Sequence, residues 1–303
     1  MKVLVTGSTG LVGNALRSDL RRAGHIVCRL VRPGTKLETH SVPEGFDVQW
    51  NPGTGELGGA AVGADAVVNL AGASIADGRW TAERKNLLRT SRVDNTAALV
   101  RALAKMAARP RVLVSASAIG YYGNRGDETL HEESGPGADF LAGLAQEWEA
   151  EARKAEVLGI RVVLARFGVI LAKGGGALPK MALPFRFGLG GRVGSGQQWM
   201  SWVTLDDTVG ALRFALENGA VRGPINVVAP QPVRNAEFTV ALAETLHRPA
   251  LFPAPAFALR LLLGEMAGAL LLSSQRVVPE QLQRLDYRFV HSDLPAALAS
   301  TLA

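Results

Sequence analysis

Short apolar runs of strand length alternate along the chain with longer stretches of helical periodicity. The strand-like runs are Lys2–Thr6, Ile26–Val31, Ala66–Leu70, Val112–Ser115 and Arg161–Ala165. Apolar residues recur every three to four positions over Leu11–Ala23, Glu83–Ala107 and Phe140–Leu158. Continuous apolar strands are typical of a parallel sheet that is covered on both faces. Their alternation with helices predicts an α/β fold with a Rossmann-type doubly wound parallel sheet.

The later part of the chain follows a different pattern. Around Pro230–Pro232 the alternation stops, and the remainder is rich in helical periodicity, with a short strand predicted over Tyr287–Val290. We therefore expect a Rossmann domain at residues 1–170, completed by a strand and a helix from the later half. Residues 171–303 are expected to form a smaller C-terminal lobe on the substrate side.

One long apolar segment could suggest insertion into a membrane. It spans Leu251–Leu272, but Arg260, Glu265 and two prolines interrupt it, and charges near the centre of a membrane span are costly. We interpret it as a core helix. At the N-terminus, the apolar run Val3–Val5 is too short for a secretory signal. No membrane partner is expected.

Composition narrows the classes of function. The 303 residues are 48% apolar, and the single cysteine, Cys28, excludes a disulfide framework and indicates a reducing compartment, so we expect a cytoplasmic location. The formal charge is only +6, without a run of basic residues with interleaved aromatics, so nucleic acid is not expected as a partner. The five histidines lack metal-ligand spacing, and no metal site is predicted. The oligomeric state is left open.

A glycine-rich turn directly follows the first predicted strand and opens the first predicted helix. In Thr6–Gly13, Gly7 permits a tight reversal, Gly10 allows the backbone to approach a pyrophosphate, and Gly13 allows the helix to pack closely on the strand. The helix N-terminus then offers unpaired N–H groups and a positive dipole end to the phosphates. The alternative is an ordinary glycine-rich turn. The residues expected to bind the dinucleotide are Gly7, Ser8, Thr9, Gly10, Leu11 and Val12.

The end of the second strand distinguishes the two nicotinamide dinucleotides. An acidic residue there would hold the ribose 2′-hydroxyl, whereas a basic residue would receive a 2′-phosphate. The strand ends in Leu30–Gly34, which contains Arg32 and no Asp or Glu. An arginine fork pairs bidentately with phosphate, so NADP is favoured over NAD as the cofactor. The alternative is that Arg32 is a solvated surface arginine.

Further motifs carry a family resemblance. Asn69–Gly72, Ser115–Gly123 and Trp202–Asp207, together with the glycine turn, resemble the extended short-chain dehydrogenase/reductases. More narrowly, the chain resembles the "epimerase family protein" branch, which is related to NAD-dependent epimerases and dehydratases, through Asp77–Trp80, Phe185–Gly191, Gly194–Gln197 and Gly223–Asn226. The resemblance implies that Leu70, Ala71, Gly72 and Arg92 also contact the cofactor. For Arg92 the alternative is an ion pair on a helix surface.

The chain departs from the catalytic pattern of that wider family. The resemblance implies a serine, then a tyrosine and a lysine four residues apart on the helix that begins near Phe140. Here those two positions are either Phe140 and Leu144 or Leu141 and Ala145, and none of these side chains transfers a proton. Ser117 matches the upstream serine, although it could simply cap a strand end.

Two hypotheses about function follow. The first is an NADP(H)-dependent oxidoreductase acting on a small molecule, in which the substrate brings an acidic proton of its own, or Ser117, Tyr121 or an ordered water supplies the proton. The second is a non-catalytic regulator that senses NADPH. Elsewhere, Asp206 and Asp207 precede an apolar helical stretch and are interpreted as an N-cap rather than an active-site pair.

Overall fold

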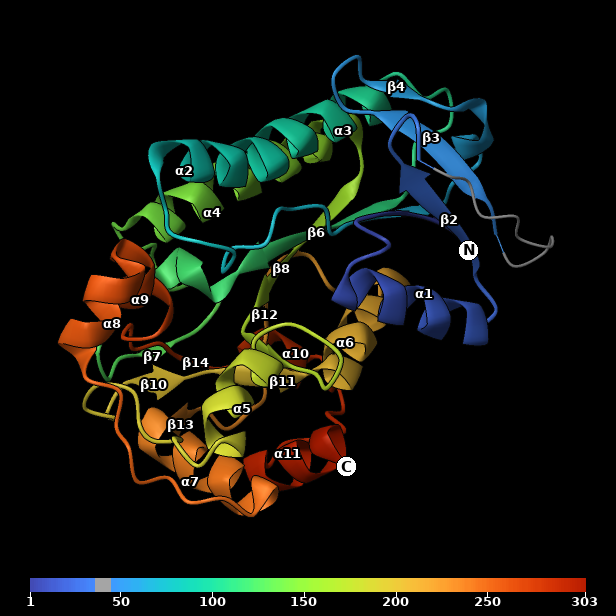
Figure 1. Cartoon of the computed structure of the whole chain (residues 1–303). Helices are drawn as coiled ribbons and strands as arrows, with labels where there is room; N and C mark the ends of the chain where they lie inside the picture. Colours follow the sequence, from blue (N-terminus) through green and yellow to red (C-terminus); the bar gives the residue numbers. More distant parts are fainter. Residues whose placement is uncertain (36–44) are drawn as a thin grey trace.

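The computed structural model describes residues 1–35 and 45–303 (Figure 1). Its strands are β1 Lys2–Thr6, β2 Ile26–Val31, β3 Asp47–Asn51, β4 Glu56–Leu57, β5 Ala66–Asn69, β6 Val112–Ala118, β7 Thr129–Leu130, β8 Arg161–Phe167, β9 Val169–Leu171, β10 Trp199–Met200, β11 Trp202–Thr204, β12 Gly223–Val227, β13 Val233–Arg234 and β14 Arg276–Val277. Its α-helices are α1 Leu11–Arg22, α2 Ala82–Arg89, α3 Asn95–Ala104, α4 Phe140–Arg153, α5 Leu178–Arg186, α6 Leu205–Glu217, α7 Asn235–Leu246, α8 Ala256–Leu263, α9 Glu265–Leu270, α10 Glu280–Arg284 and α11 Leu294–Leu302.

The main sheet has eight strands in the order β12-β8-β6-β5-β1-β2-β3-β4, and its pairs are parallel except for the edge hairpin β3–β4. All five predicted strands lie in this sheet, so the predicted fold class is confirmed. Helices α1 and α6 cover one face, and α2, α3 and α4 cover the other (Figure 1). The chain leaves β1 toward β2 on one side and returns to β5 on the other. In doubly wound sheets, ligands bind beside such a reversal, in a crevice at the carboxyl ends of the strands.

The ranges of two strands and the break in one helix were not predicted. Strand β3 alternates between buried and exposed residues because it lies near the sheet edge, and β12 returns from the later half to pair with β8. The helix expected over Glu83–Ala107 is divided into α2 and α3 by a π-helical turn at Thr90–Asp94.

Two local predictions in the later half were wrong. No strand forms at Tyr287–Val290, where the backbone N–H groups of Val290 and His291 instead donate to the Asp207 carboxylate at 2.7 and 3.0 Å. The N-cap of α6 is Thr204, whose Oγ1 accepts from the Asp207 N–H at 3.1 Å. Asp207 is fully buried in the first turn of α6 and fixes the chain that follows α10.

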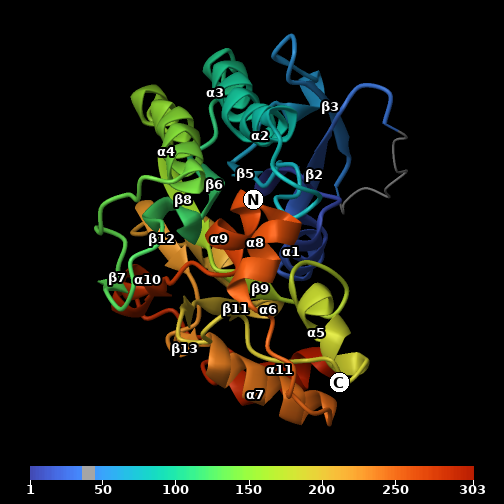
Figure 2. The same ribbon diagram turned by 60° about the vertical axis from the view of Figure 1, so that its left-hand side comes forward.

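The C-terminal lobe packs around α5, α7 and α11, which share one apolar cluster (Figure 2). The predicted core helix at Leu251–Leu272 is wrong. Gly264, with φ of +63°, separates the segment into α8 and α9, and α8 has no buried residue. Within residues 1–35 and 45–303, no helix has the length and apolar character needed to span a bilayer.

The hydrogen bonds of Asp207 generate a stability prediction. Asp207→Ala should lower the free energy of unfolding by about 3 kcal/mol, because two part-buried backbone N–H groups lose a buried, charged acceptor. The neighbouring exposed Asp206→Ala should cost less than about 0.5 kcal/mol. Urea unfolding of both variants measures this difference. Equal losses in the two variants would contradict the role assigned to Asp207.

Candidate functional site

The turn between β1 and α1 depends on three glycines. Gly7 has a φ of +64°, and a Cβ there would lie 2.6 Å from the backbone of Leu70. A Cβ on Gly13 would lie 2.2 Å from the carbonyl oxygen of Gly7, so the helix approaches the turn more closely than any other residue type allows. Gly10, in contrast, is exposed, and its Cβ would meet only the Gly7 carbonyl at 3.3 Å. The side of the turn at Gly10 is therefore open to a ligand.

The first turn of α1 has the features of an anion-binding helix terminus. Gly10 is its N-cap and supplies no side-chain hydrogen bond, and the first turn contains no acidic residue. The N–H groups of Leu11 and Val12 have no intrahelical acceptors at this position. Together with the helix dipole, they form a site suited to a pyrophosphate.

A buried polar cluster holds the loop after β5 against this turn. The Thr6 hydroxyl accepts from the N–H groups of Leu70 at 3.0 Å and Ala71 at 3.2 Å, and it donates to Asn69 Oδ1 at 2.7 Å. The Asn69 amide in turn donates to Thr96 Oγ1 at 2.9 Å. These contacts bring Leu70–Gly72 beside the glycine turn, and no sequence pattern indicated this role of Thr6 and Asn69.

The π-helical turn directs Arg92 toward the same loop. Its Nη2 donates to the carbonyl oxygen of Ala73 at 2.9 Å, and a Cβ on Gly72 would lie 3.2 Å from its Cζ. The guanidinium also lies 5.3 Å from the Trp148 ring centre. Burial, with a further contribution from Arg84, lowers the pKa of Arg92 to about 10. Within the described ranges Arg92 makes no ion pair, so the surface ion-pair alternative does not describe it.

Arg32 directly follows β2, the strand that pairs with β1 in parallel. The carboxyl ends of the two strands lie at the same edge of the sheet, so Arg32 shares that edge with Gly7. Its side chain is exposed and has no hydrogen-bond or ion-pair partner in the part of the chain that the structure covers.

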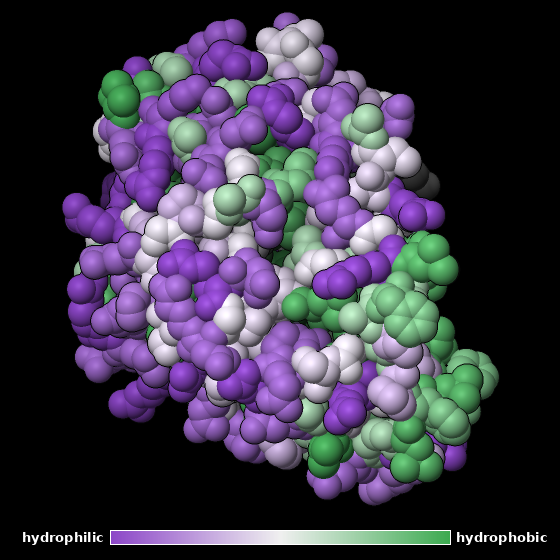
Figure 3. Space-filling view, turned by 90° about the vertical axis from the view of Figure 1, so that its left-hand side faces the viewer, coloured by the Kyte–Doolittle hydropathy of each residue, from purple (hydrophilic) through white to green (hydrophobic). Residues whose placement is uncertain are grey.

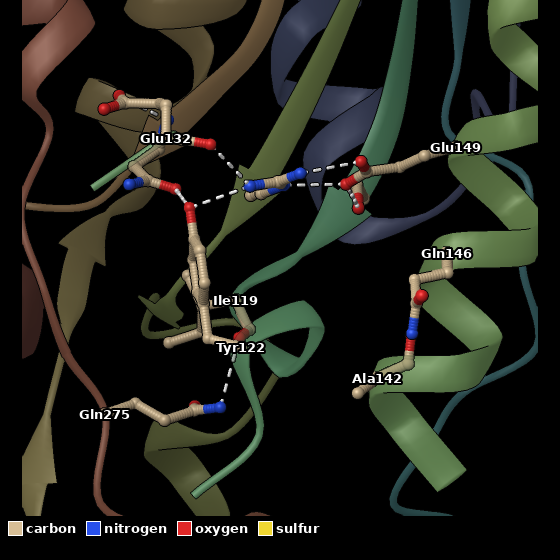
Figure 4. Close-up of polar contacts among 10 residues, drawn as sticks. Ile119, Tyr122, Glu132, Ala142, Gln146, Glu149 and Gln275 are labelled. Carbon is tan, nitrogen blue, oxygen red and sulfur yellow. Dashed lines mark hydrogen bonds and ion pairs between the residues drawn. The ribbon is translucent and has the colours of Figure 1, made fainter. Parts of the chain in front are cut away.

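Ser117 lies near the end of β6 and belongs to a buried ion-pair network around Glu149, the residue labelled in Figure 4. Its Oγ donates to Glu149 Oε1 at 2.6 Å. Glu149, on α4, also receives two bonds of 2.8 Å from the Arg166 guanidinium, one to each carboxylate oxygen. The predicted alternative, a serine that caps a backbone N–H, is not what its hydroxyl does here. No sequence pattern indicated that Glu149 and Arg166 would meet Ser117.

The network continues from Arg166 toward the C-terminal lobe. Arg166 Nη1 donates to the Tyr122 hydroxyl at 2.9 Å and to the Glu132 carbonyl at 3.1 Å. The Tyr122 hydroxyl donates to Asn226 Oδ1 at 2.7 Å, and burial raises the pKa of Tyr122 to about 12. The Tyr122 hydroxyl therefore has a structural role, because both of its hydrogen bonds are made within the protein.

Tyr121 differs from its neighbour. Its ring lies 3.6 Å from the Arg166 guanidinium, face to cation, and the residue is only partly buried. Among the described residues its hydroxyl has no hydrogen-bond partner. Tyr121 is thus held in place by its ring, and its hydroxyl is free to form a hydrogen bond with a ligand.

The structure favours one of the two registers considered for α4. Leu141 and Ala145 precede Glu149 by two turns and one turn, so all three lie on one helix face, and Glu149 bonds Ser117 from that face. Leu141 also packs against Gly120, just beyond Ser117. Phe140 instead packs against Trp80 at 5.4 Å. The positions expected to hold tyrosine and lysine thus contain leucine and alanine, and the nearby Gln146 amide turns back to the Ala142 carbonyl at 3.1 Å (Figure 4).

Comparison with known proteins identifies close relatives. Residues 3–228 match the NAD dependent epimerase/dehydratase family, and residues 254–301 match a domain of unknown function, DUF1731. An epimerase family protein of Mycobacterium bovis is 44% identical over 299 residues, covering 98% of this chain and 96% of its own. The epimerase family protein YfhF of Bacillus subtilis is 39% identical, covering 100% and 98%.

One similar crystal structure contains a dinucleotide. Human epimerase family protein SDR39U1 (isoform 2), determined with NADPH, is 33% identical and superposes with a TM-score of 0.87, covering 100% of this chain and 99% of its own. The predicted resemblance to the epimerase family branch is confirmed.

Glu132 generates a pH-dependent prediction. Burial raises its pKa above the ordinary value, against the opposing effect of backbone hydrogen bonds, and its Oε2 has no partner in the described chain. Because the folded state binds this proton more tightly, wild-type stability should fall as the pH rises above the unfolded pKa of about 4.3. Glu132→Gln should therefore gain stability relative to wild type between pH 4.5 and 7.5, as measured by urea unfolding.

The exposed neighbour provides the control for this measurement. Glu133→Gln should show no such change of relative stability with pH. A Glu132→Gln difference that is constant over the same range would contradict the account of a destabilising buried charge.

Proposed function

The chain belongs to the NAD-dependent epimerase/dehydratase family, and from that premise we propose that it binds NADPH at the N-terminus of α1. The observation that carries the proposal is the open turn at Gly10, which exposes unpaired N–H groups where a Cβ would otherwise stand. Gly7, Ser8, Thr9, Leu11 and Val12 would surround the pyrophosphate there. Leu70, Ala71, Gly72 and Arg92 would line the crevice beside it.

The preference for a 2′-phosphate rests on Arg32. This exposed, unpartnered guanidinium shares the sheet edge with the glycine turn, and Leu30–Gly34 contains no carboxylate to hold a ribose hydroxyl. The human relative whose structure was determined with NADPH supports the same choice.

Arg32→Asp tests the cofactor assignment. We expect the affinity for NADPH to fall at least about 10-fold more than the affinity for NADH, because a bidentate charge-assisted contact becomes a repulsion. Titration of nucleotide fluorescence measures both. Gly10→Val is the matching variant at the pyrophosphate site. It should lower the affinities for NADPH and NADH to the same extent. Equal affinities of the unmodified protein for NADPH and NADH would contradict the assignment.

For the reaction, we propose reduction of a carbonyl group on a small molecule. The bound nicotinamide supplies the hydride, and a protein group must supply the proton that completes the alcohol. Tyr121 has a hydroxyl with no other commitment in the described structure and a ring fixed on Arg166. Ser117 has a hydroxyl whose proton already points to Glu149, so its oxygen is left to accept a hydrogen bond. Tyr121 would donate the proton to the carbonyl oxygen, and the Ser117 oxygen would orient the substrate by accepting a hydrogen bond from a hydroxyl or N–H group elsewhere on it.

Substitution of these two hydroxyls tests the reaction. Tyr121→Phe and Ser117→Ala should each slow turnover of a carbonyl substrate by roughly 10²-fold or more, with unchanged NADPH affinity. A screen of aldehydes, ketones, quinones and sugar nucleotides supplies the substrate. Turnover unaffected by either change would contradict their assignment.

A regulatory role is the second candidate. It is favoured by Leu141 and Ala145 at the usual proton-transfer positions and by a Glu149 carboxylate occupied by Ser117 and Arg166. Tight NADPH binding without turnover in the screen would support a sensor of NADPH over an enzyme.

A further inference from the structure

An exposed hydrophobic surface lies on the C-terminal lobe, away from the network around Arg166. We call it the apolar face, and it comprises Phe187, Leu189, Phe252, Phe257, Leu261 and Leu262. Each of these side chains is between 56% and 79% exposed. Figure 3 shows hydrophobic side chains gathered along the right-hand edge of the molecule. Apolar patches of this kind on a folded protein mark interaction sites.

Two segments carry the apolar face. One contains Phe187 and Leu189, the other contains Phe252, Phe257, Leu261 and Leu262, and backbone hydrogen bonds join them. The N–H of Phe252 donates to the carbonyl of Gly190 at 3.0 Å, and the N–H of Ala254 donates to that of Arg192 at 2.9 Å. Helix α8 follows immediately and has seven apolar residues among eight, with none buried. Phe257 and Leu261 are four residues apart, so they project from one side of the helix.

The charge around the apolar face has one sign. Residues 171–199 and 248–264 contain six Lys or Arg residues and no Asp or Glu. Arg186, Arg192 and Arg260 are exposed and make no ion pair within the described chain. Two acids on neighbouring elements are already engaged, since Asp77 pairs with Lys180 and Glu265 with Lys85.

From this juxtaposition we propose that the apolar face and its three free arginines bind the surface of an anionic lipid membrane. Apolar side chains beside basic residues are the pattern of interfacial helices, which insert the former among acyl chains and pair the latter with anionic headgroups. A second copy of the chain fits less well, because a twofold contact would oppose these arginines without any acid between them. The proposal concerns attachment to the surface and is compatible with the lack of a spanning helix in the described chain.

Vesicle flotation of the full chain tests the proposal. We expect binding to vesicles of phosphatidylcholine with phosphatidylglycerol, and about 100-fold weaker binding to phosphatidylcholine alone, since each basic residue near the surface contributes about a factor of 5. A similar loss of affinity for the anionic vesicles is expected for the triple variant Arg186→Gln, Arg192→Gln, Arg260→Gln. Phe257→Ser with Leu261→Ser should also weaken binding. The NADPH affinity of each variant, measured without lipid, shows whether that variant is folded.

Matched controls come from exposed residues elsewhere on the chain. One control combines Val62→Ser with Val157→Ser, which replaces side chains that are 69% and 90% exposed. The other removes three exposed cations by replacing Arg101, Arg222 and Arg284 with Gln. Both controls should bind vesicles like wild type. Equal binding to the two vesicle types, binding to neither, or equal loss in the controls would overturn the proposal. So would a stable dimer that is lost in the Phe257/Leu261 variant, because it identifies a second copy as the occupant.

Discussion

The buried ion pair between Arg166 and Glu149 ties together one helix and three strands of the main sheet. It joins β8 to α4, reaches β6 through Ser117, and reaches β12 through Tyr122 and Asn226. Burying both charges is favourable only when their remaining hydrogen-bonding groups are satisfied, and here Ser117, Tyr122 and a backbone carbonyl satisfy them. The network therefore fixes the carboxyl ends of three neighbouring strands.

This constraint separates two parts of the crevice. On the β1 side, the site is made of backbone, because Gly7 and Gly13 allow contacts that no side chain permits. On the β6 side, the polar groups are already bonded to one another, and the face of α4 that approaches them carries Leu141 and Ala145. The proposed nucleotide-binding platform is thus combined with an edge of the sheet where leucine and alanine take the places at which the family resemblance implies a tyrosine and a lysine. Tyr121, held by its ring alone, is the group at this edge that remains available for chemistry.

Features set by local pattern could be predicted from the sequence. The five central strands were predicted because they are buried on both faces, and the glycine turn because its spacing carries a steric requirement. Strand β3 lies near an edge and alternates, and β12 begins with Gly223 and Pro224, so neither has the apolar run of a central strand. Contacts such as Ser117 with Glu149, or Asp207 with the backbone of Val290, join residues far apart in sequence and depend on tertiary register. The apolar segment of α8 was assigned to the core because composition does not reveal whether a partner element covers it.

A crystal structure of the protein with NADPH tests the central claim most directly. The account predicts the pyrophosphate over the first turn of α1, the 2′-phosphate on Arg32, and Glu149 still bonded to both Ser117 and Arg166. A dinucleotide bound elsewhere, or one whose 2′-phosphate points away from Arg32, would contradict the account of the cofactor site. A Glu149 side chain released from Arg166 and turned toward the nicotinamide would contradict the structural role given to the ion pair.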